Sequence, residues 1–187
     1  MEGPERFPRL VSIACHDLRT PLATVYGFAR TLVRAGNQDE RTMRYLGMIE
    51  AAAEQMTVLL DDLGTAARIV GNRFEPALRE VDTLELARSD DERVEVTGSG
   101  APVETDPDAV RGSLRAFARA ALRHGPVEQV TWSVAGPAFV LSPVTAAAAP
   151  VVSGEEQRDL GSLVGLLVIS ALGGACSLDG ETFRVSL

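Results

Sequence analysis

Residues 11–32 read VSIACHDLRTPLATVYGFARTL, and the spacing of their apolar side chains decides the fold of the N-terminal part of the chain. The apolar positions follow one another at alternating steps of four and three residues: Val11, Cys15, Leu18, Leu22, Val25, Ala29 and Leu32. This spacing places them on one stripe of an α-helix, the seam that is typical of helical bundles and coiled coils. The stretch therefore predicts a long amphipathic helix.

A second apolar stripe with the same spacing follows. Its members are Leu46, Ile49, Ala53, Met56, Leu60, Leu63 and Ala67. Between the two stripes lies the segment Ala35-Gly36-Asn37-Gln38-Asp39, in which Gly36 is suited to ending the first helix and Asp39 to capping the second. Residues 1–70 are therefore predicted to form a helical hairpin.

A single hairpin would leave one side of its apolar seam uncovered. Each helix would be about 35 Å long at a rise of about 1.5 Å per residue, and burial of so long a stripe requires another hairpin. We therefore expect a homodimer in which two hairpins form a four-helix bundle. The alternative is that the second half of the chain covers the seam.

The second half of the chain, residues 71–187, mixes strand-like and helix-like patterns. Helices are predicted after the cap Asp106-Pro107, ending at Gly125-Pro126, and over residues 160–172, with a mobile loop over residues 145–156. Strands are expected over residues 94–97, 103–105, 129–134, 138–141, 175–178 and 182–187. This order of elements indicates a small α/β sandwich with helices on one face of the sheet, so the predicted fold class is α+β.

The composition argues against several classes of function. The chain has 187 residues, 45% hydrophobic and 24% charged, and its net charge of −8 disfavours nucleic-acid binding, which needs cations that face the phosphates. The two cysteines, Cys15 and Cys176, lie far apart and only two histidines occur, so no metal site is expected. We see no signal peptide and no membrane-spanning stretch, and therefore expect a cytoplasmic location.

Five residues between positions 16 and 21, beside the first seam, carry the candidate chemistry. His16 lies where a rigid helix can present one ring nitrogen to a phosphoryl donor in solvent. Asp17 can accept a hydrogen bond from the imidazole and raise its nucleophilicity, and Thr20, one turn on, can orient a water for dephosphorylation. Arg19 is expected to help neutralise phosphoryl charge, or else to be an ordinary solvated arginine. Pro21 lacks an N–H and should bend the helix.

The string HDLRTPL, residues 16–22, resembles the H-box of sensor histidine kinases, which lies in their dimerisation and phosphotransfer domain. The resemblance extends along the chain. Residues 45–69 are similar to the second helix of that domain, residues 106–111 to the start of the N-box helix, and residues 180–187 to the final strand of a Bergerat-type ATP-binding domain. The resemblance implies that His16 is the phosphoacceptor and that residues 71–187 form a Bergerat-type α/β sandwich.

The nucleotide-binding motifs of that second domain are degenerate in this chain. The asparagine that would ligate magnesium corresponds to Ala120, whose methyl group offers no oxygen to a cation. The Asp-x-Gly-x-Gly motif that recognises adenine corresponds to residues 142–146, with Ser142 in place of the carboxylate and Val144 in place of a glycine. Residues 82–88 are also too short for the usual long first helix of the domain.

The glycine-rich loop of the family corresponds to residues 159–162. Gly161 is present there, but Asp159 would put a negative charge at a helix N-terminus that should meet phosphates. Asp159 can also be read as an ordinary helix cap. Because both interpretations disfavour a phosphate, we expect no nucleotide cofactor and no bound metal.

The resemblance implies a histidine phosphotransferase of a two-component phosphorelay, similar to the phosphotransferases that derive from kinases. His16 would accept a phosphoryl group from a receiver-domain aspartate and pass it to a second receiver without ATP. The expected partners are a second copy of the chain, response-regulator receiver domains and a hybrid histidine kinase. Two alternatives stay open: a non-catalytic pseudo-histidine-kinase scaffold that heterodimerises with a kinase or sequesters receivers, and a histidine kinase with an atypical ATP site.

Overall fold

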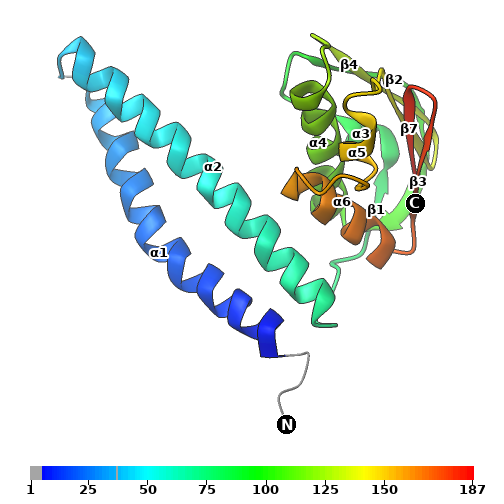
Figure 1. Ribbon diagram of the computed structural model, residues 1–187, viewed down its shortest axis with the longest axis horizontal. Coiled ribbons are helices and arrows are strands. Elements are labelled where there is room, and N and C mark those ends of the chain that lie inside the picture. Colours follow the sequence, from blue (N-terminus) through cyan, green and yellow to red (C-terminus); the bar gives the residue numbers. More distant parts are fainter. Residues whose placement is uncertain (1–5, 37) are drawn as a thin grey trace. The chain divides into compact units, whose positions relative to one another are not determined.

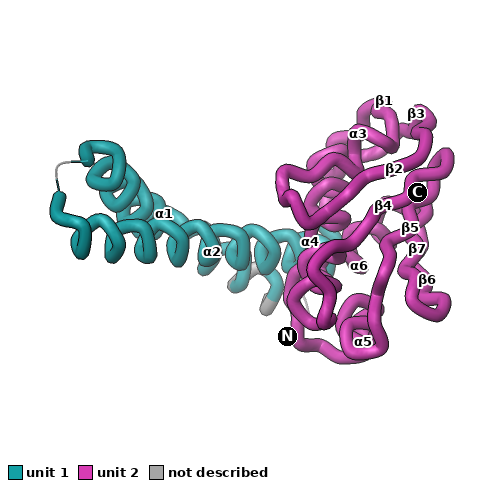
Figure 2. The backbone as a smooth tube through the Cα atoms, turned by 90° about the horizontal axis from the view of Figure 1, so that it is seen from above, with its two compact units in different colours: residues 1–73 teal, residues 74–187 magenta. Residues whose placement is uncertain are grey.

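The computed structural model describes residues 6–36 and 38–187 of the chain. Residues 1–5 of the predicted hairpin, Asn37 of the predicted turn and the side chains of residues 6, 7, 9 and 10 lie outside this description. The chain divides into two compact units, residues 1–73 and residues 74–187, drawn in teal and magenta in Figure 2. Within the described residues, no helix combines the length and the apolarity that crossing a bilayer requires.

Unit 1 is a helical hairpin made of α1 (Arg6–Ala35) and α2 (Glu40–Val70), as Figure 1 shows. Helix α1 ends before Gly36, whose φ of +63° lies in the left-handed region that favours glycine. Helix α2 begins after Asp39, whose carboxylate accepts hydrogen bonds from the backbone N–H and the hydroxyl of Thr42 at 3.0 and 2.6 Å. The predicted hairpin and both of these helix-end signals are confirmed.

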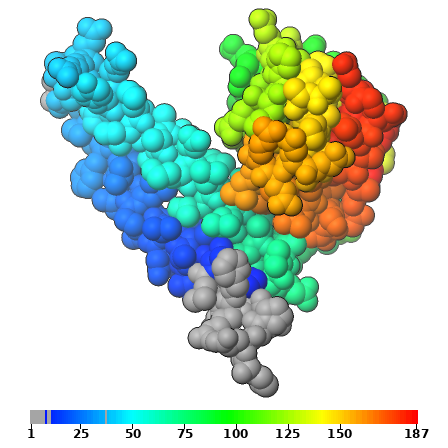
Figure 3. All heavy atoms as spheres, viewed as in Figure 1, coloured from blue at the N-terminus to red at the C-terminus, as the bar shows by residue number. Residues whose placement is uncertain are grey.

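The hairpin buries only part of each apolar stripe, and Val11, Leu46 and Leu60 are half-buried. The buried members are Cys15, Leu22 and Ala29 in α1 and Ala53 and Ala67 in α2. The exposed members are Leu18 (55% exposed), Val25 (48%) and Leu32 (40%) in α1 and Ile49 (44%), Met56 (46%) and Leu63 (39%) in α2. We call these six exposed residues the outer stripe. Most of the buried members are small, so the two helices lie in close contact (Figure 3) while the larger side chains face solvent.

Unit 2 contains a five-stranded mixed sheet and a separate two-stranded sheet. The larger sheet has the strand order β2-β4-β5-β7-β6, in which only β2 and β4 are parallel neighbours, and the smaller one pairs β1 with β3. The strands are β1 (Arg79–Asp82), β2 (Val94–Gly100), β3 (Pro102–Thr105), β4 (Val130–Gly136), β5 (Ala138–Ser142), β6 (Ala175–Asp179) and β7 (Thr182–Ser186). The expected strands are confirmed, with ends that differ by a few residues, and β1 was missed.

Four helices complete unit 2. They are α3 (Thr83–Ala87), α4 (Pro107–His124), α5 (Ala149–Val152) and α6 (Leu160–Ala171). Helix α4 begins as predicted, because the Asp106 carboxylate accepts from the backbone N–H groups of Asp108 and Ala109, both at 3.1 Å, and Pro107 occupies the first turn. Helix α3 is as short as the sequence indicated.

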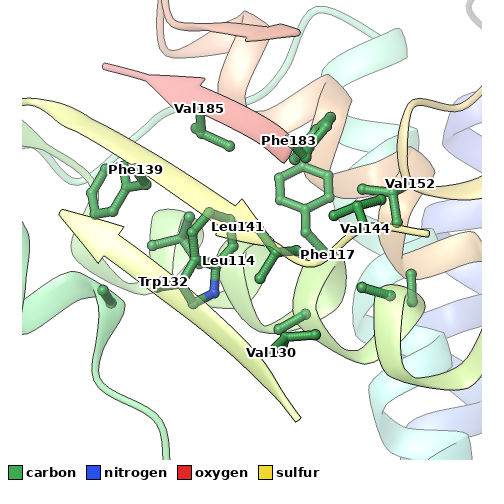
Figure 4. Close-up of a cluster of buried hydrophobic side chains, with 14 of the residues drawn as sticks. Leu114, Phe117, Val130, Trp132, Phe139, Leu141, Val144, Val152, Phe183 and Val185 are labelled. Carbon is green, nitrogen blue, oxygen red and sulfur yellow. The ribbon is translucent and has the colours of Figure 1, made fainter. Parts of the chain in front are cut away.

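The core of unit 2 lies between one face of the larger sheet and α4. Figure 4 shows Leu114 and Phe117 of α4 together with Trp132, Phe139 and other residues of the sheet. The ring of Phe117 lies 4.9 Å from that of Phe183, centroid to centroid, and the rings of Trp132 and Phe139 meet edge to face at 6.3 Å. Helices on one sheet face and a hairpin before them confirm the α+β fold class.

The segment of residues 145–156 is not the mobile loop that we predicted. It contains α5, in which Val151 and Val152 are almost fully buried, and the preceding Val144 and Ala148 are buried as well. The prediction was wrong because the small apolar side chains of this alanine-rich segment show no helical or strand periodicity, although several of them are buried. Val144, Ala148 and Val152 belong to the same core as α4, and burial of each valine is worth about 1.5 kcal/mol or more.

Candidate functional site

His16 lies on the exposed flank of α1. Its neighbour Cys15 belongs to the buried half of the stripe, and Leu22 continues that half through the next turns of the helix. His16 follows Cys15 directly, and its imidazole points away from the seam. The His16 side chain is 80% exposed. The packed side of α1 therefore holds the backbone in place while the ring stays accessible to a partner molecule.

The imidazole of His16 contacts the adjacent acid. Its Nδ1 atom lies 3.2 Å from Oδ1 of Asp17, whose side chain is 73% exposed. A carboxylate only accepts hydrogen bonds, so in the tautomer that makes this hydrogen bond Nδ1 carries the proton, and Nε2 of the neutral ring keeps its lone pair. The arrangement leaves Nε2, the nitrogen farther from the backbone, accessible from solvent.

Arg19 is bound across the hairpin. Its Nη2 atom donates a hydrogen bond to Oδ1 of Asp61 on α2 at 2.6 Å, and both side chains are partly exposed. Asp61 was not among the residues singled out from the sequence. The sequence shows two adjacent acids, Asp61 and Asp62. It does not show which residue of the first helix they face, because that depends on how the two helices pack.

Thr20 and Pro21 complete the string that the sequence singled out. Thr20 is exposed one turn beyond His16, and its backbone carbonyl accepts a hydrogen bond from the Thr24 hydroxyl at 3.2 Å. Helix α1 continues without a break through Pro21, although proline cannot donate to the Asp17 carbonyl. The bend at Pro21 stays a prediction.

The positions of the degenerate nucleotide motifs lie in unit 2, and three of them belong to elements around its core. Ala120 of α4 and Val144 after β5 are both fully buried, and Ser142 is half-buried at the end of β5. The side chains of Ala120 and Val144 carry no polar atom. Neither of them can therefore bind a cation or recognise a base through its side chain.

Asp159 is the N-cap of α6. Its carboxylate accepts a hydrogen bond from the backbone N–H of Ser162 at 3.1 Å, which confirms the helix-cap interpretation. The same carboxylate is only 11% exposed and lies 3.5 Å from Nη1 of Arg123 and 3.4 Å from Nε2 of His124 at the end of α4. The N-terminus of α6, next to Gly161, thus already faces an anion of the protein itself.

The arrangement in unit 1 suits nucleophilic chemistry at an exposed imidazole. In the part of the chain that the structure describes, no three His, Cys, Asp or Glu side chains gather in a way that would hold a metal ion. In unit 2 the sequence did not reveal that Arg123 and His124 lie beside the Asp159 carboxylate, because Asp159 is far from them along the chain.

Comparison with known proteins connects the hairpin to a family. Residues 9–71 match the His Kinase A (phospho-acceptor) domain. Sensor protein DivL of Caulobacter vibrioides is 28% identical over 122 residues, which cover 62% of this chain and 16% of DivL. The probable sensor histidine kinase TcrY of Mycobacterium tuberculosis is 32% identical over 65 residues, which cover 35% of this chain and 14% of TcrY. The chain thus matches only a small part of the length of these relatives.

Solved structures resemble the fold of nearly the whole chain. Full-length ShkA, solved in complex with AMPPNP, has a TM-score of 0.67 at 20% identity. The match covers 95% of this chain and 44% of the ShkA chain. The histidine kinase AdeS of Acinetobacter baumannii has a TM-score of 0.55 at 20% identity. The match covers 92% of this chain and 96% of the AdeS chain. The fold is therefore that of histidine kinases, a phosphoacceptor hairpin followed by an ATPase-like α/β domain. Residues 9–71 form a His Kinase A (phospho-acceptor) domain, and the chain is sensor histidine kinase-like.

Proposed function

We propose that the protein is a histidine phosphotransferase of a phosphorelay, which carries a phosphoryl group on His16 and exchanges it with receiver-domain aspartates without using ATP. The proposal assigns the chemistry to the hairpin of residues 1–70 and a packing role to residues 71–187. It places the protein in the cytoplasm, together with its receiver partners.

The observation that carries the proposal is the state of the His16 ring. The ring is 80% exposed, its Nδ1 is engaged by Asp17, and Nε2 makes no hydrogen bond with any described residue. A nucleophile that must reach a phosphoryl group held by another protein needs this combination of exposure and fixed orientation.

The proposed transfer step balances without a further reactant. Nε2 of His16 attacks the phosphorus of the aspartyl phosphate, the N–P bond forms as the P–O bond breaks, and the receiver aspartate leaves as a carboxylate. The proton on Nδ1 stays on the ring, so the product is a phosphorylated imidazolium whose charge faces the Asp17 carboxylate. Attack by the aspartate of a second receiver reverses the step and passes the phosphoryl group on.

Neighbouring residues of α1 have supporting roles in this proposal. Arg19, held by Asp61 at 2.6 Å and partly exposed, contributes positive charge near the phosphoryl group. The exposed hydroxyl of Thr20, on the same face as His16, orients a water when the phosphohistidine is hydrolysed. Pro21 shapes the helix one turn beyond the histidine.

The proposal that the protein does not use ATP is argued from residues of unit 2. The Asp159 carboxylate already occupies the helix N-terminus where phosphates would bind, and it forms an ion pair with Arg123 at 3.5 Å. A nucleotide phosphate would have to displace this carboxylate or lie beside it, with like-charge repulsion. The buried methyl groups of Ala120 and Val144 add no ligand for magnesium or adenine.

The proposal includes a homodimer. The outer stripe leaves six apolar side chains exposed along the two helices of the hairpin, which argues for a second hairpin that packs against them. The dimer would be a four-helix bundle with one His16 on each hairpin.

Transfer of radiolabel from phosphorylated receivers tests the proposal. We expect a panel of receivers labelled on aspartate to pass the label to the full chain as an acid-labile, base-stable phosphohistidine. The variant His16→Ala should accept no label. The matched control is His124→Gln, which removes the other histidine of the chain and should accept label normally.

A second arm of the same experiment uses γ-labelled ATP with magnesium. The proposal expects no labelling of His16 from ATP, and His16-dependent labelling would instead indicate a histidine kinase with an atypical ATP site. If no receiver of a broad panel transfers label while receivers still bind the chain, the protein is a scaffold and the phosphotransferase proposal is wrong.

A further inference from the structure

A small cavity lies in unit 2, away from the degenerate nucleotide positions. It has a volume of about 110 Å³ and opens between the end of α3, the loop of residues 88–91, α4 and the strands β2 and β4. Its apolar floor includes Leu114 and Trp132, which Figure 4 shows next to each other in the core. Neither the hairpin nor any of the positions 120, 142, 144, 159 and 161 contributes to its lining.

Three arginines line this cavity: Arg88, Arg115 and Arg119. None of them has a carboxylate within ion-pair distance among the described residues. All three side chains belong to exposed residues, so their guanidinium groups can reach an incoming ligand. The cavity thus combines a closed apolar floor with a cationic rim.

The acids of the lining offset this charge only in part: the charge of Arg119 helps to lower the pKa of Asp91, but the two side chains form no ion pair. Asp91 is already bound by Arg93, whose Nε and Nη2 atoms donate to its two carboxylate oxygens at 3.0 and 2.8 Å. Arg93 itself is not part of the lining, so it neutralises Asp91 from outside. Asp90 is therefore the one acid of the lining that is not bound by an arginine among the described residues, and the lining contains three arginines.

The spacing along α4 strengthens the observation. Arg111, Arg115, Arg119 and Arg123 follow one another at intervals of four residues and therefore form one row on the helix. The outer two are paired, Arg111 with Asp108 at 3.5 Å and Arg123 with Asp159 at 3.5 Å. Like charges at this spacing repel each other weakly, so an anion that binds between the two central arginines would relieve this repulsion.

We propose that Arg115 and Arg119, with Arg88 from the opposite wall, bind the phosphate group of a small ligand in this cavity. Guanidinium groups one helical turn apart can both direct their N–H donors at a single phosphate, which arginine binds in bidentate fashion. The volume of about 110 Å³ suits a phosphate group and little more, well below the roughly 300 Å³ at which pockets for whole drug-sized ligands begin. The ligand is therefore inorganic phosphate or the phosphate end of a small monoester.

Calorimetric titration of the full chain at low ionic strength tests this site, with inorganic phosphate and O-phosphoserine as probes. We expect saturable binding of at least one probe. Tighter binding of O-phosphoserine indicates a monoester ligand, and equal or tighter binding of phosphate indicates the free anion. The double variant Arg115→Gln/Arg119→Gln should weaken binding by about tenfold or more, because two charge-assisted contacts are lost.

The matched control is Arg111→Gln, which removes the next arginine of the same row outside the cavity and should leave the affinity within about twofold. Circular dichroism verifies that both variants are folded. Lack of saturable binding to the unaltered chain, or an equal loss of affinity in Arg111→Gln, overturns the proposal. The site is independent of His16, so either result leaves the phosphotransfer proposal untouched.

Discussion

The Nη2 atom of Arg19 on α1 lies 2.6 Å from Oδ1 of Asp61 on α2, so the helix that carries His16 is tied to its neighbour three residues beyond the histidine. The contact fixes one end of a flexible arginine at the flank where a phosphoryl group would arrive. Because the two side chains are 43% and 58% exposed, its effect should be on geometry more than on stability.

Substitution of Asp61 and of Arg19 separates these two effects. We expect Asp61→Asn to lower the free energy of unfolding by less than about 1 kcal/mol, because exposed ion pairs contribute little. Arg19→Gln should slow phosphoryl transfer to His16 by about tenfold, because a charge near the phosphoryl group is lost. The control Glu50→Gln removes the longer Arg30–Glu50 contact of 3.9 Å in the same hairpin and should leave transfer unchanged. Urea unfolding and initial rates of label transfer measure the two quantities.

Asp17→Asn tests the role of the carboxylate next to His16. An amide can still hydrogen-bond to Nδ1 but cannot stabilise the positive charge of a phosphorylated imidazolium, so we expect transfer to slow by about 10- to 100-fold. Labelled His16 should still form. The initial rate of label transfer gives the result, and a rate equal to that of the unaltered chain would show that the 3.2 Å contact has no part in the chemistry.

Met56→Glu tests the outer stripe as a dimer interface. Met56 is 46% exposed in the hairpin, and a dimer would bury one introduced carboxylate from each chain. We expect the dimer dissociation constant to rise by at least about 100-fold, because unpaired buried charges are costly. The control is Met48→Glu, at a methionine that is 60% exposed and lies outside the stripe. Sedimentation equilibrium distinguishes the two, and equal behaviour of both variants would exclude this interface.

Phe117→Ala tests the core of unit 2. Phe117 has no exposed surface and its ring lies 4.9 Å from that of Phe183, so the truncation should cost about 3–5 kcal/mol of unfolding free energy. The single tryptophan of the chain, Trp132, is 1% exposed in the same core, and its fluorescence follows the unfolding of unit 2 in urea. Phe28→Ala, at a phenylalanine that is 69% exposed on α1, should leave this transition within about 0.5 kcal/mol.

Asp91→Asn tests a pH-dependent contribution to stability. The side-chain hydrogen bonds from Arg93, followed by the backbone N–H of Arg93 and by the charges of Arg93 and Arg119, lower the pKa of Asp91 from 3.8 to about 2. A carboxyl with a lowered pKa stabilises the fold above its ordinary pKa, and this contribution is lost as the pH falls through about 2. We expect the variant to be less stable by about 1 kcal/mol at neutral pH.

The difference between Asp91→Asn and the unaltered chain should shrink as the pH is lowered from 4 towards 2. Urea unfolding followed through Trp132 at each pH gives the comparison. Asp90→Asn is the control, because the Asp90 carboxylate makes no ion pair with the described residues. A difference that stays constant over this pH range would contradict the assignment.

Several elements could be read from local patterns alone. The two helices of the hairpin follow from their apolar spacing, Gly36 and Asp39 mark its turn, and Asp106-Pro107 marks the start of α4. Strand β1 was missed because Arg79–Asp82 carries only one apolar side chain, so no alternation was visible. Helix α5 was missed because a short apolar run of small residues does not distinguish a buried turn of helix from a loop.

The sequence by itself determined that His16 lies one position from a buried seam on a long helix, because helical periodicity is a property of neighbouring residues. Only the tertiary structure decided which members of the seam are buried, that Arg19 binds Asp61 and that Asp159 lies beside Arg123 and His124. These contacts join residues far apart in the chain, and their partners depend on how whole helices pack against one another. Local spacing carries no information about that packing.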